Sequence, residues 1–364
     1  MSKLAHPLAL IGVRTFTELA WKHGVDRECL AKAAILLLSC GIAVPFRWLD
    51  TLVSSRLVSR TPVPHAPLFI IGHWRSGTTH LHNLFSLDPQ FGCLRGIHCL
   101  AARSFLGTRR LIRMLLGPHL PSRRPMDDVE FGLDRPQEDE FAMSRIASMS
   151  MMHGFWFPRR MREIFDRWVM FDAASPTDVR SWKQTFDWML RRVSIDEGNR
   201  RLCLKCPPHM ARLSLLREMF PDARFVHIYR NPHVVYQSNL KMWKSLIAAG
   251  TLQQHDDGQL EENLVYFYQR MLGRFFEDAP SIPENRLVHV RFEDLETNPL
   301  AEMQRIYSVL ELTGYDNASP GLLSYLEGHA NYRKNTYHFD EDSLRRVERE
   351  WGFALSRWGY NRPG

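Results

Sequence analysis

The stretch "IIGHWRSGTTH", residues 70–80, places a short apolar run directly before a glycine-rich turn and a helix start. Gly72 and Gly77 have the G-x-x-x-x-G spacing of a phosphate-binding loop. Thr78 stands where a nucleoside triphosphatase carries lysine, and the cation of the loop is Arg75. Backbone N–H groups at such a turn attract an anion, and a forked arginine suits a tetrahedral oxyanion. The stretch therefore predicts an anion site that differs from a triphosphate site.

Apolar runs and helical runs alternate on both sides of this loop. Uninterrupted apolar strands separated by helices predict a parallel sheet with helices on both faces, an α/β fold of the P-loop type. We expect one domain over residues 1–364, with a helical N-terminal extension (1–66) and a helical insert (126–197). Strands are predicted at 68–71, 202–205, 224–229 and 287–292, and helices at 79–86, 210–220, 300–312 and from Pro232, with Asn231 as its N-cap.

Composition limits the class of protein. The 364 residues are 45% hydrophobic and 24% charged, which is typical of a globular protein with a sizeable core. The net charge of +7 indicates acidic partners. Nucleic acid is not expected, because the chain has no zinc-finger spacing and no RNP-type aromatic motif. Six scattered cysteines favour a reducing, cytoplasmic location, and Cys203 and Cys206 lack a second pair for zinc.

The most apolar segment is "AAILLLSCGIAVPF", residues 33–46. Fourteen residues are too few to span a bilayer, and Pro45 ends a helix at this point. A buried packing helix is the favoured interpretation. The other is an interfacial anchor, which the basic residues 107–124 would assist as a peripheral membrane contact. Residues 1–22 do not have the form of an ordinary signal peptide.

Two further cations fall at predicted strand ends. Arg230 ends "RFVHIYR", and Ser238 follows about two helical turns later. Lys205 ends "RLCLK". Because ligands of parallel sheets bind beyond the carboxyl ends of the strands, all three side chains are candidates to contact one anion.

Together these segments resemble the PAPS-dependent sulfotransferases, in particular their large-insert bacterial branch, over most of residues 67–360. The resemblance implies in-line transfer of a sulfuryl group from 3'-phosphoadenosine 5'-phosphosulfate (PAPS) to a hydroxyl acceptor. It also implies release of 3',5'-ADP and no metal ion. It assigns the 5'-phosphosulfate to Arg75, Ser76, Gly77, Thr78 and Thr79, the 3'-phosphate to Arg230 and Ser238, the bridging oxygen to Lys205, and closure over the donor to Lys334.

The acceptor hydroxyl needs a base, and superfamily members use His or Glu after the first βα unit. His98 is the first candidate and Glu138 the second; Glu140 and His209 stay open. The acceptor is expected to be a small or lipid-like molecule. Four tryptophans of the insert could line its pocket or belong to the core, and the core is favoured: Trp156, Trp168, Trp182 and Trp188.

Two other functions are compatible with the same motifs. A kinase-like phosphotransferase could hold its metal through Asp294, which follows the run "LVHVRFE". A non-catalytic, membrane-peripheral nucleotide-binding protein would use the loop and the apolar segment 33–46. The missing Walker lysine counts against the kinase.

Overall fold

The computed structural model describes residues 10–63, 66–119, 132–328 and 339–363. The chain divides into two compact units. The helical unit comprises Met1–Pro64, Cys93–Asn199 and Trp243–Leu260, and the sheet unit comprises His65–Gly92, Arg200–Met242 and Glu261–Gly364. Nearly all of the predicted N-terminal extension and all of the predicted insert fall within the ranges of the helical unit. A single domain over the whole chain stays a prediction.

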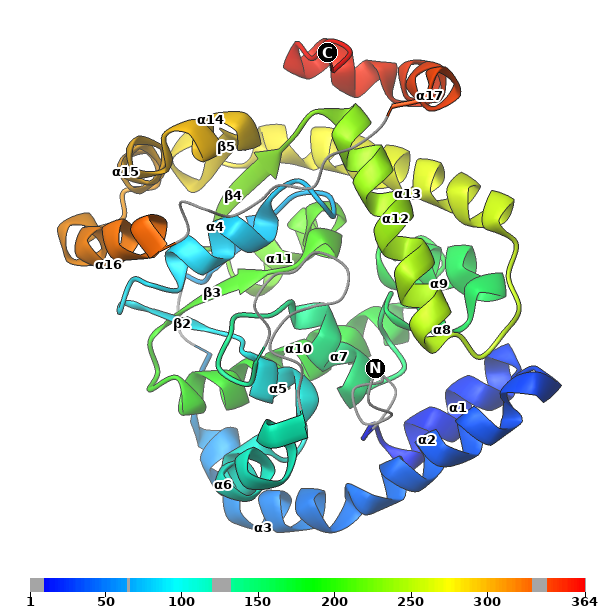
Figure 1. The fold of residues 1–364 in the computed structure, drawn as a ribbon. Helices are drawn as coiled ribbons and strands as arrows, with labels where there is room; N and C mark the ends of the chain where they lie inside the picture. Colours follow the sequence, from blue (N-terminus) through cyan, green and yellow to red (C-terminus); the bar gives the residue numbers. More distant parts are fainter. Residues whose placement is uncertain (1–9, 64–65, 120–131, 329–338, 364) are drawn as a thin grey trace. The chain divides into compact units, whose positions relative to one another are not determined.

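The sheet has five strands among the described residues, in the order β2-β3-β1-β4-β5 (Figure 1). β1 pairs in parallel with β3 and with β4, and β4 pairs in parallel with β5. The predicted parallel α/β fold is therefore confirmed. The three-residue strand β2 was not predicted, because so short a run carries no periodicity. The strands are β1 (Leu68–Ile71), β2 (Phe91–Cys93), β3 (Arg201–Lys205), β4 (Arg224–Tyr229) and β5 (Leu287–Arg291).

In the sheet unit, helices come after the strands in the chain and pack against them. α4 packs against β1 and β3, and α15 packs against β5. α12 begins at Pro232, and Asn231 Oδ1 accepts a hydrogen bond from the His233 N–H at 3.0 Å, as the sequence predicted. The helices are α4 (Thr78–Phe85), α11 (Leu213–Met219), α12 (Pro232–Gly250), α13 (Asp257–Asp278), α14 (Phe292–Thr297), α15 (Pro299–Val309), α16 (Tyr315–Gly328) and α17 (Glu341–Trp358), with α12 and α13 contributing to both units.

The apolar segment 33–46 does not form the buried helix that was favoured. It is divided between α2 and α3, which separate at Ala43 and leave Pro45 in the first turn of α3. Leu36 is buried, but Leu38 and Ile42 are exposed, so the prediction of a packing helix is only half right. The helices of this unit are α1 (Val13–His23), α2 (Leu30–Ile42), α3 (Val44–Arg60), α5 (Gly96–Leu100), α6 (Phe105–Leu116), α7 (Asp139–Ile146), α8 (His153–Trp156), α9 (Met161–Trp168) and α10 (Pro176–Asp196).

A buried ion pair fixes α3 within the helical unit. Asp50 is fully buried, and its carboxylate lies 2.6 Å from Nη2 of Arg192 on α10. The Gly107 N–H of α6 and the Ser54 hydroxyl donate to the same carboxylate at 2.6 and 3.1 Å. Because Arg192 is the cation among these donors, removing it would leave a buried charge uncompensated.

Candidate active site

The loop between β1 and α4 requires glycine at both ends. Gly72 has φ +153°, and a Cβ there would lie 2.3 Å from the carbonyl oxygen of Ile228. Gly77 has φ +98°, and its Cβ would lie 2.2 Å from the ring of Phe292. Both positions thus combine a left-handed backbone with a close approach that only glycine permits. The G-x-x-x-x-G spacing reflects a real constraint on the loop.

Arg75 connects the two motifs that the sequence singled out. It has φ +70°, an uncommon conformation for a residue other than glycine. Its Nε donates a hydrogen bond to Oγ of Ser238 on α12 at 2.7 Å. Ser76 and Ser238 are both buried. The loop and the second motif are therefore parts of one site in the sheet unit.

α12 also braces the loop through residues that the sequence analysis missed. The side-chain amide of Asn239, fully buried, donates to the Trp74 and Val235 carbonyl oxygens at 2.8 Å each. His73 is buried beside them, and burial lowers its pKa from 6.5 to about 3, so it is neutral near pH 7. Asn239 directly follows Ser238 in the chain, which is the signal that could have identified it.

Lys205 lies at the carboxyl end of β3, in register with Ile70 of β1. The residue is buried, and its Nζ lies 3.4 Å from Oγ1 of Thr79 at the start of α4. A buried cation beside a helix N-terminus creates a strongly positive environment. This position suits a lysine that neutralises charge on a bound anion.

Arg230 lies at the end of the next strand, above an aromatic ring. Its guanidinium carbon is 4.1 Å from the ring centroid of Phe292, the same ring that closes against Gly77. Phe292 thus positions both the loop and Arg230, although the sequence analysis gave its segment only a structural role. Its location at the end of β5 was the available signal, since residues at strand ends line ligand sites.

Ser76 and Arg230 line the same small pocket of the sheet unit, together with His73 and Tyr268. Its volume, about 10 Å³, holds no more than about one water molecule. A nucleotide would therefore lie over these side chains and could not enter the pocket between them. Tyr360 donates to the Glu293 carboxylate at 2.6 Å and the Asn231 N–H donates to it at 3.3 Å, which secures the start of α12 below Arg230.

His98 belongs to the helical unit, and both of its ring nitrogens have hydrogen-bond partners. Its Nδ1 accepts a hydrogen bond from the Arg95 N–H at 2.9 Å, and its Nε2 lies 2.7 Å from the Asp196 carboxylate. This pattern fixes the neutral tautomer that carries its proton on Nε2. Burial opposes ionisation of Asp196, but hydrogen bonds from His98 and Arg109 hold its pKa below the usual value.

The two glutamates proposed from the sequence have different environments. Glu140 is buried, and its carboxylate accepts a hydrogen bond from the Met151 N–H at 2.8 Å. Glu138 is the N-cap residue of α7 and is only half-buried. Of the three candidates in this unit, Glu138 is the least enclosed and therefore the one best suited to meet a substrate.

Two candidates from the sequence remain, one for the base and one for closure over the donor. His209 is buried in the sheet unit, with its ring edge-on to Phe69 of β1 at 5.5 Å. Lys334, expected to close over the donor, lies outside the described residues.

A cluster of His98, Asp196 and Glu197 in the helical unit has the spacing of a metal site. Arginines neutralise both of its carboxylates, however. Arg95 Nε lies 2.6 Å from Glu197, and Arg109 contacts Asp196. We interpret the cluster as a buried ion-pair network and do not assign it a cation.

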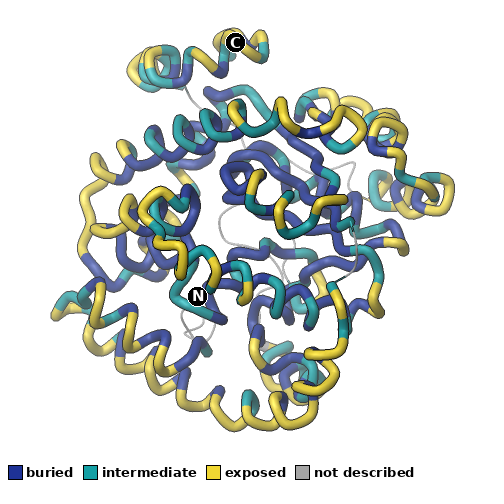
Figure 2. Tube along the Cα trace, turned by 180° about the vertical axis from the view of Figure 1, so that it is seen from behind, coloured by how far each residue is buried: buried dark blue, intermediate teal, exposed yellow. Residues whose placement is uncertain are grey.

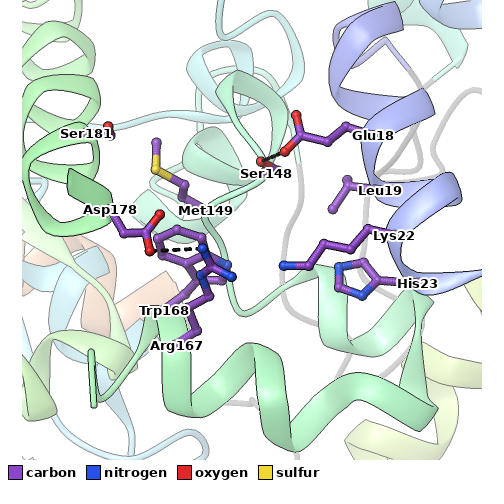
Figure 3. A pocket seen from close by; sticks show the side chains of 10 residues that line it. All are labelled: Glu18, Leu19, Lys22, His23, Ser148, Met149, Arg167, Trp168, Asp178 and Ser181. Carbon is purple, nitrogen blue, oxygen red and sulfur yellow. Dashed lines mark hydrogen bonds and ion pairs between the residues drawn. The ribbon is translucent and has the colours of Figure 1, made fainter. Parts of the chain in front are cut away.

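A cavity of about 160 Å³ in the helical unit lies among residues of α1, α9 and α10 (Figure 3). Lys22 and Arg167 extend into it from opposite sides. Arg167 donates to Asp178 at 2.9 Å, and Ser148 donates to Glu18 at 3.0 Å. So charged a lining does not suit an apolar acceptor. The insert tryptophans do not form such a pocket either, because Trp156, Trp168 and Trp182 are buried in the core and Trp188 packs under Arg192.

The chemistry of the sheet edge is that of a polyanion site. Arg75, Lys205 and Arg230 supply three cations at the carboxyl ends of neighbouring strands. The hydroxyls of Ser76, Thr78, Thr79 and Ser238 and the N-terminus of α4 add donors. Such an arrangement can hold separate phosphate-like groups and stabilise charge that develops between them.

Comparison with known proteins agrees with this chemistry. A model of the family described as "Sulfotransferase family" matches residues 67–317. An omega-hydroxy-beta-dihydromenaquinone-9 sulfotransferase, Stf3, is 32% identical over 314 residues in both Mycobacterium bovis and Mycobacterium tuberculosis, covering 85% of this chain and 79% of the relative. Sulfotransferase STF9 from Mycobacterium avium shares the fold with a TM-score of 0.69, at 18% identity and 98% coverage of both chains. Sulfotransferase STF1 from Mycobacterium tuberculosis has a TM-score of 0.66, at 18% identity over 93% of this chain and 90% of its own.

Proposed function

This chain belongs to the sulfotransferase family and is an enzyme of sulfuryl transfer, and we propose that its donor is PAPS and its acceptor a hydroxyl group on a small, lipid-like molecule. The observation that carries the donor assignment is the hydrogen bond between Arg75 and Ser238. It joins the loop expected to hold the 5'-phosphosulfate to the helix expected to hold the 3'-phosphate. A donor with phosphates at both positions would need such a pair.

Each charged group of this donor has a matching set of residues at the sheet edge. The loop runs into the start of α4, where a phosphosulfate would accept hydrogen bonds from the loop N–H groups and from Arg75. Lys205, buried beside Thr79, would neutralise the oxygen that leaves with the phosphate. Fixed cations would do here what a metal ion does in triphosphate sites, so we propose that transfer requires no metal.

The transfer consists of one bond formed and one broken. The acceptor oxygen attacks sulfur while the bond from sulfur to the phosphate oxygen breaks, and 3',5'-ADP leaves with that electron pair. The acceptor proton passes to a base. We propose Glu138 for this role over His98, because both ring nitrogens of His98 already have hydrogen-bond partners.

The acceptor class is supported by the relatives. The Stf3 proteins are named for omega-hydroxy-beta-dihydromenaquinone-9, and this chain covers most of their length. We therefore propose an apolar alcohol over a carbohydrate. A cytoplasmic location is supported by six free cysteines, five of them buried.

The test is calorimetric titration of the full chain with 3',5'-ADP in the presence of EDTA. We expect binding that Arg230→Ala weakens by roughly 2–3 kcal/mol, because a charge-assisted contact is lost. Arg224→Ala is the matched control, since Arg224 lies at the other end of β4 and donates to the Glu311 carbonyl oxygen. An unmodified protein that bound no 3',5'-ADP would refute the donor assignment.

A further inference from the structure

Helix α3 of the helical unit has its polar and apolar faces reversed. Its buried residues are Asp50, Ser54 and Val58, which follow the i, i+4, i+8 spacing of one helical face. Large apolar side chains point outward instead: Trp48 is 73% exposed and Leu52 80% exposed. A surface helix of a globular protein normally shows the opposite pattern. Something apolar must therefore meet the outer side of α3.

The exposed apolar surface continues from α3 onto α2. We define the apolar face by six of these exposed side chains: Leu38, Ile42, Trp48, Leu52, Val53 and Leu57. Figure 2 shows much of this helix pair as exposed. Contiguous apolar patches of this kind mark interaction sites with proteins or membranes.

We propose that the apolar face binds the surface of an anionic lipid bilayer, with α2 and α3 lying in the plane of the membrane. The evidence for the occupant is charge. From Leu30 to Val63 the only acidic residue is Asp50, which is buried against Arg192. The exposed cations of α3 are Arg56 and Arg60, and α6, which packs against α3, adds Arg110. Apolar side chains with cations and no exposed carboxylate are typical of helices at a lipid interface.

The segment 27–60 passes the length and composition test for a membrane span, with 28% of its most apolar window buried. Two contacts within the helical unit argue that it lies on the membrane and does not cross it. Asp50, in the middle of α3, is paired with the buried Arg192 of α10, and Lys32 Nζ on α2 donates to the Thr251 carbonyl oxygen at 3.0 Å. Both α2 and α3 are therefore held against the folded unit on one side.

A second copy of the chain is a poorer occupant of this face. In a symmetric dimer the same patch meets itself, so Arg56 and Arg60 would be buried against a surface of α2 and α3 that offers no exposed carboxylate. A membrane rich in anionic lipid supplies the missing charge. Trp48 adds a side chain that favours the boundary between headgroups and acyl chains. This inference stands without the proposed donor and acceptor.

The test is flotation of the full chain with phosphatidylcholine vesicles, with and without phosphatidylglycerol. We expect flotation that depends on phosphatidylglycerol and falls about tenfold in Leu52→Glu and in Arg56→Glu. Leu323→Glu is the matched control, because Leu323 is an exposed leucine on α16 of the sheet unit. All variants should keep the thermal midpoint and the 3',5'-ADP affinity of the unmodified protein.

Three results would overturn the proposal. The first is absence of flotation with either vesicle, and the second is equal flotation of Leu52→Glu and the unmodified chain. The third is a dimer in light scattering that Leu52→Glu dissociates, which would assign the apolar face to a second copy. Loss of 3',5'-ADP binding in the unmodified protein would count against the proposed donor and leave this result unaffected.

Discussion

Arg75 Nε and Ser238 Oγ form a 2.7 Å hydrogen bond between residues 163 positions apart. The serine thus holds the cation of the loop in place, and the proposed donor would bring its 3'-phosphate to the same hydroxyl. We expect Ser238→Ala to weaken 3',5'-ADP binding about tenfold, the loss of one hydrogen bond to a charged group. Calorimetry checks this, with Ser245→Ala on the exposed side of α12 as the control. Unchanged affinity would remove Ser238 from the site.

Gly77→Ala should damage both the fold and the site. The new methyl group would meet the Phe292 ring at 2.2 Å in a backbone conformation of φ +98°. We expect the free energy of unfolding to fall by about 1–3 kcal/mol and nucleotide binding to be lost. Gly273→Ala on α13 is the control, because nothing lies within 4 Å of its Cβ position. In that variant the free energy of unfolding should rise by about 0.5–1 kcal/mol, because alanine favours the helix more than glycine does.

Lys205 should act on the transfer step more than on binding. Lys205→Met removes the buried cation beside Thr79 at the end of β3. We expect kcat to fall about 10²–10³-fold, as when a group that stabilises developing charge is deleted. Affinity for 3',5'-ADP should change less than kcat. Equal losses in both would indicate that the lysine only binds the nucleotide.

Glu138→Gln should lower kcat by about 10²–10⁴-fold while 3',5'-ADP binding is kept, if this carboxylate accepts the proton. The acidic limb of the pH–rate profile should disappear with it. In contrast, His98→Gln should chiefly reduce stability, because it breaks the contacts with Asp196 and Arg95. A normal pH–rate profile in Glu138→Gln would return the role to another residue.

His153 makes stability depend on pH. Burial lowers its pKa from 6.5 to about 4, and its Nε2 lies 3.0 Å from the Ser144 carbonyl oxygen. Between pH 6.5 and 4, His153 is therefore protonated in the unfolded chain but remains neutral in the folded chain. Stability should fall as pH drops through this window, by up to about 1.4 kcal/mol per pH unit. Urea unfolding at several pH values measures this. The free energy of unfolding should depend less steeply on pH in His153→Gln, whereas the surface variant His255→Gln should keep the pH dependence of the unmodified protein.

The sequence predicts the sheet well because its central strands are largely buried. Every residue of β1 is buried, and an uninterrupted apolar run is the expected pattern for such a strand. The loop after β1 could also be predicted, because close contacts with Ile228 and Phe292 require glycine at positions 72 and 77. Such constraints fix the residue type and therefore appear in the sequence.

Other features could not be predicted because they depend on distant partners. The location of Phe292 at the end of β5 marks it as a candidate site residue, but it does not tell that its ring lies against both Gly77 and Arg230. The sequence made His98 the first candidate for the base, but it could not show that Asp196 and the Arg95 N–H form hydrogen bonds with its two ring nitrogens. The apolar segment 33–46 was expected to be buried, because a single sequence cannot reveal that α3 turns Asp50 inward to meet Arg192.

That ion pair also sets an order of events during synthesis. Asp50 leaves the ribosome 142 residues before Arg192, an interval of about 7–30 s at 5–20 residues per second. Throughout it, the nascent chain carries the apolar helices α2 and α3 with a carboxylate that has no counter-ion. The N-terminal helices can therefore reach their final packing only after α10 has been translated. Truncations that end before α10 should expose α2 and α3 to chaperones and aggregation.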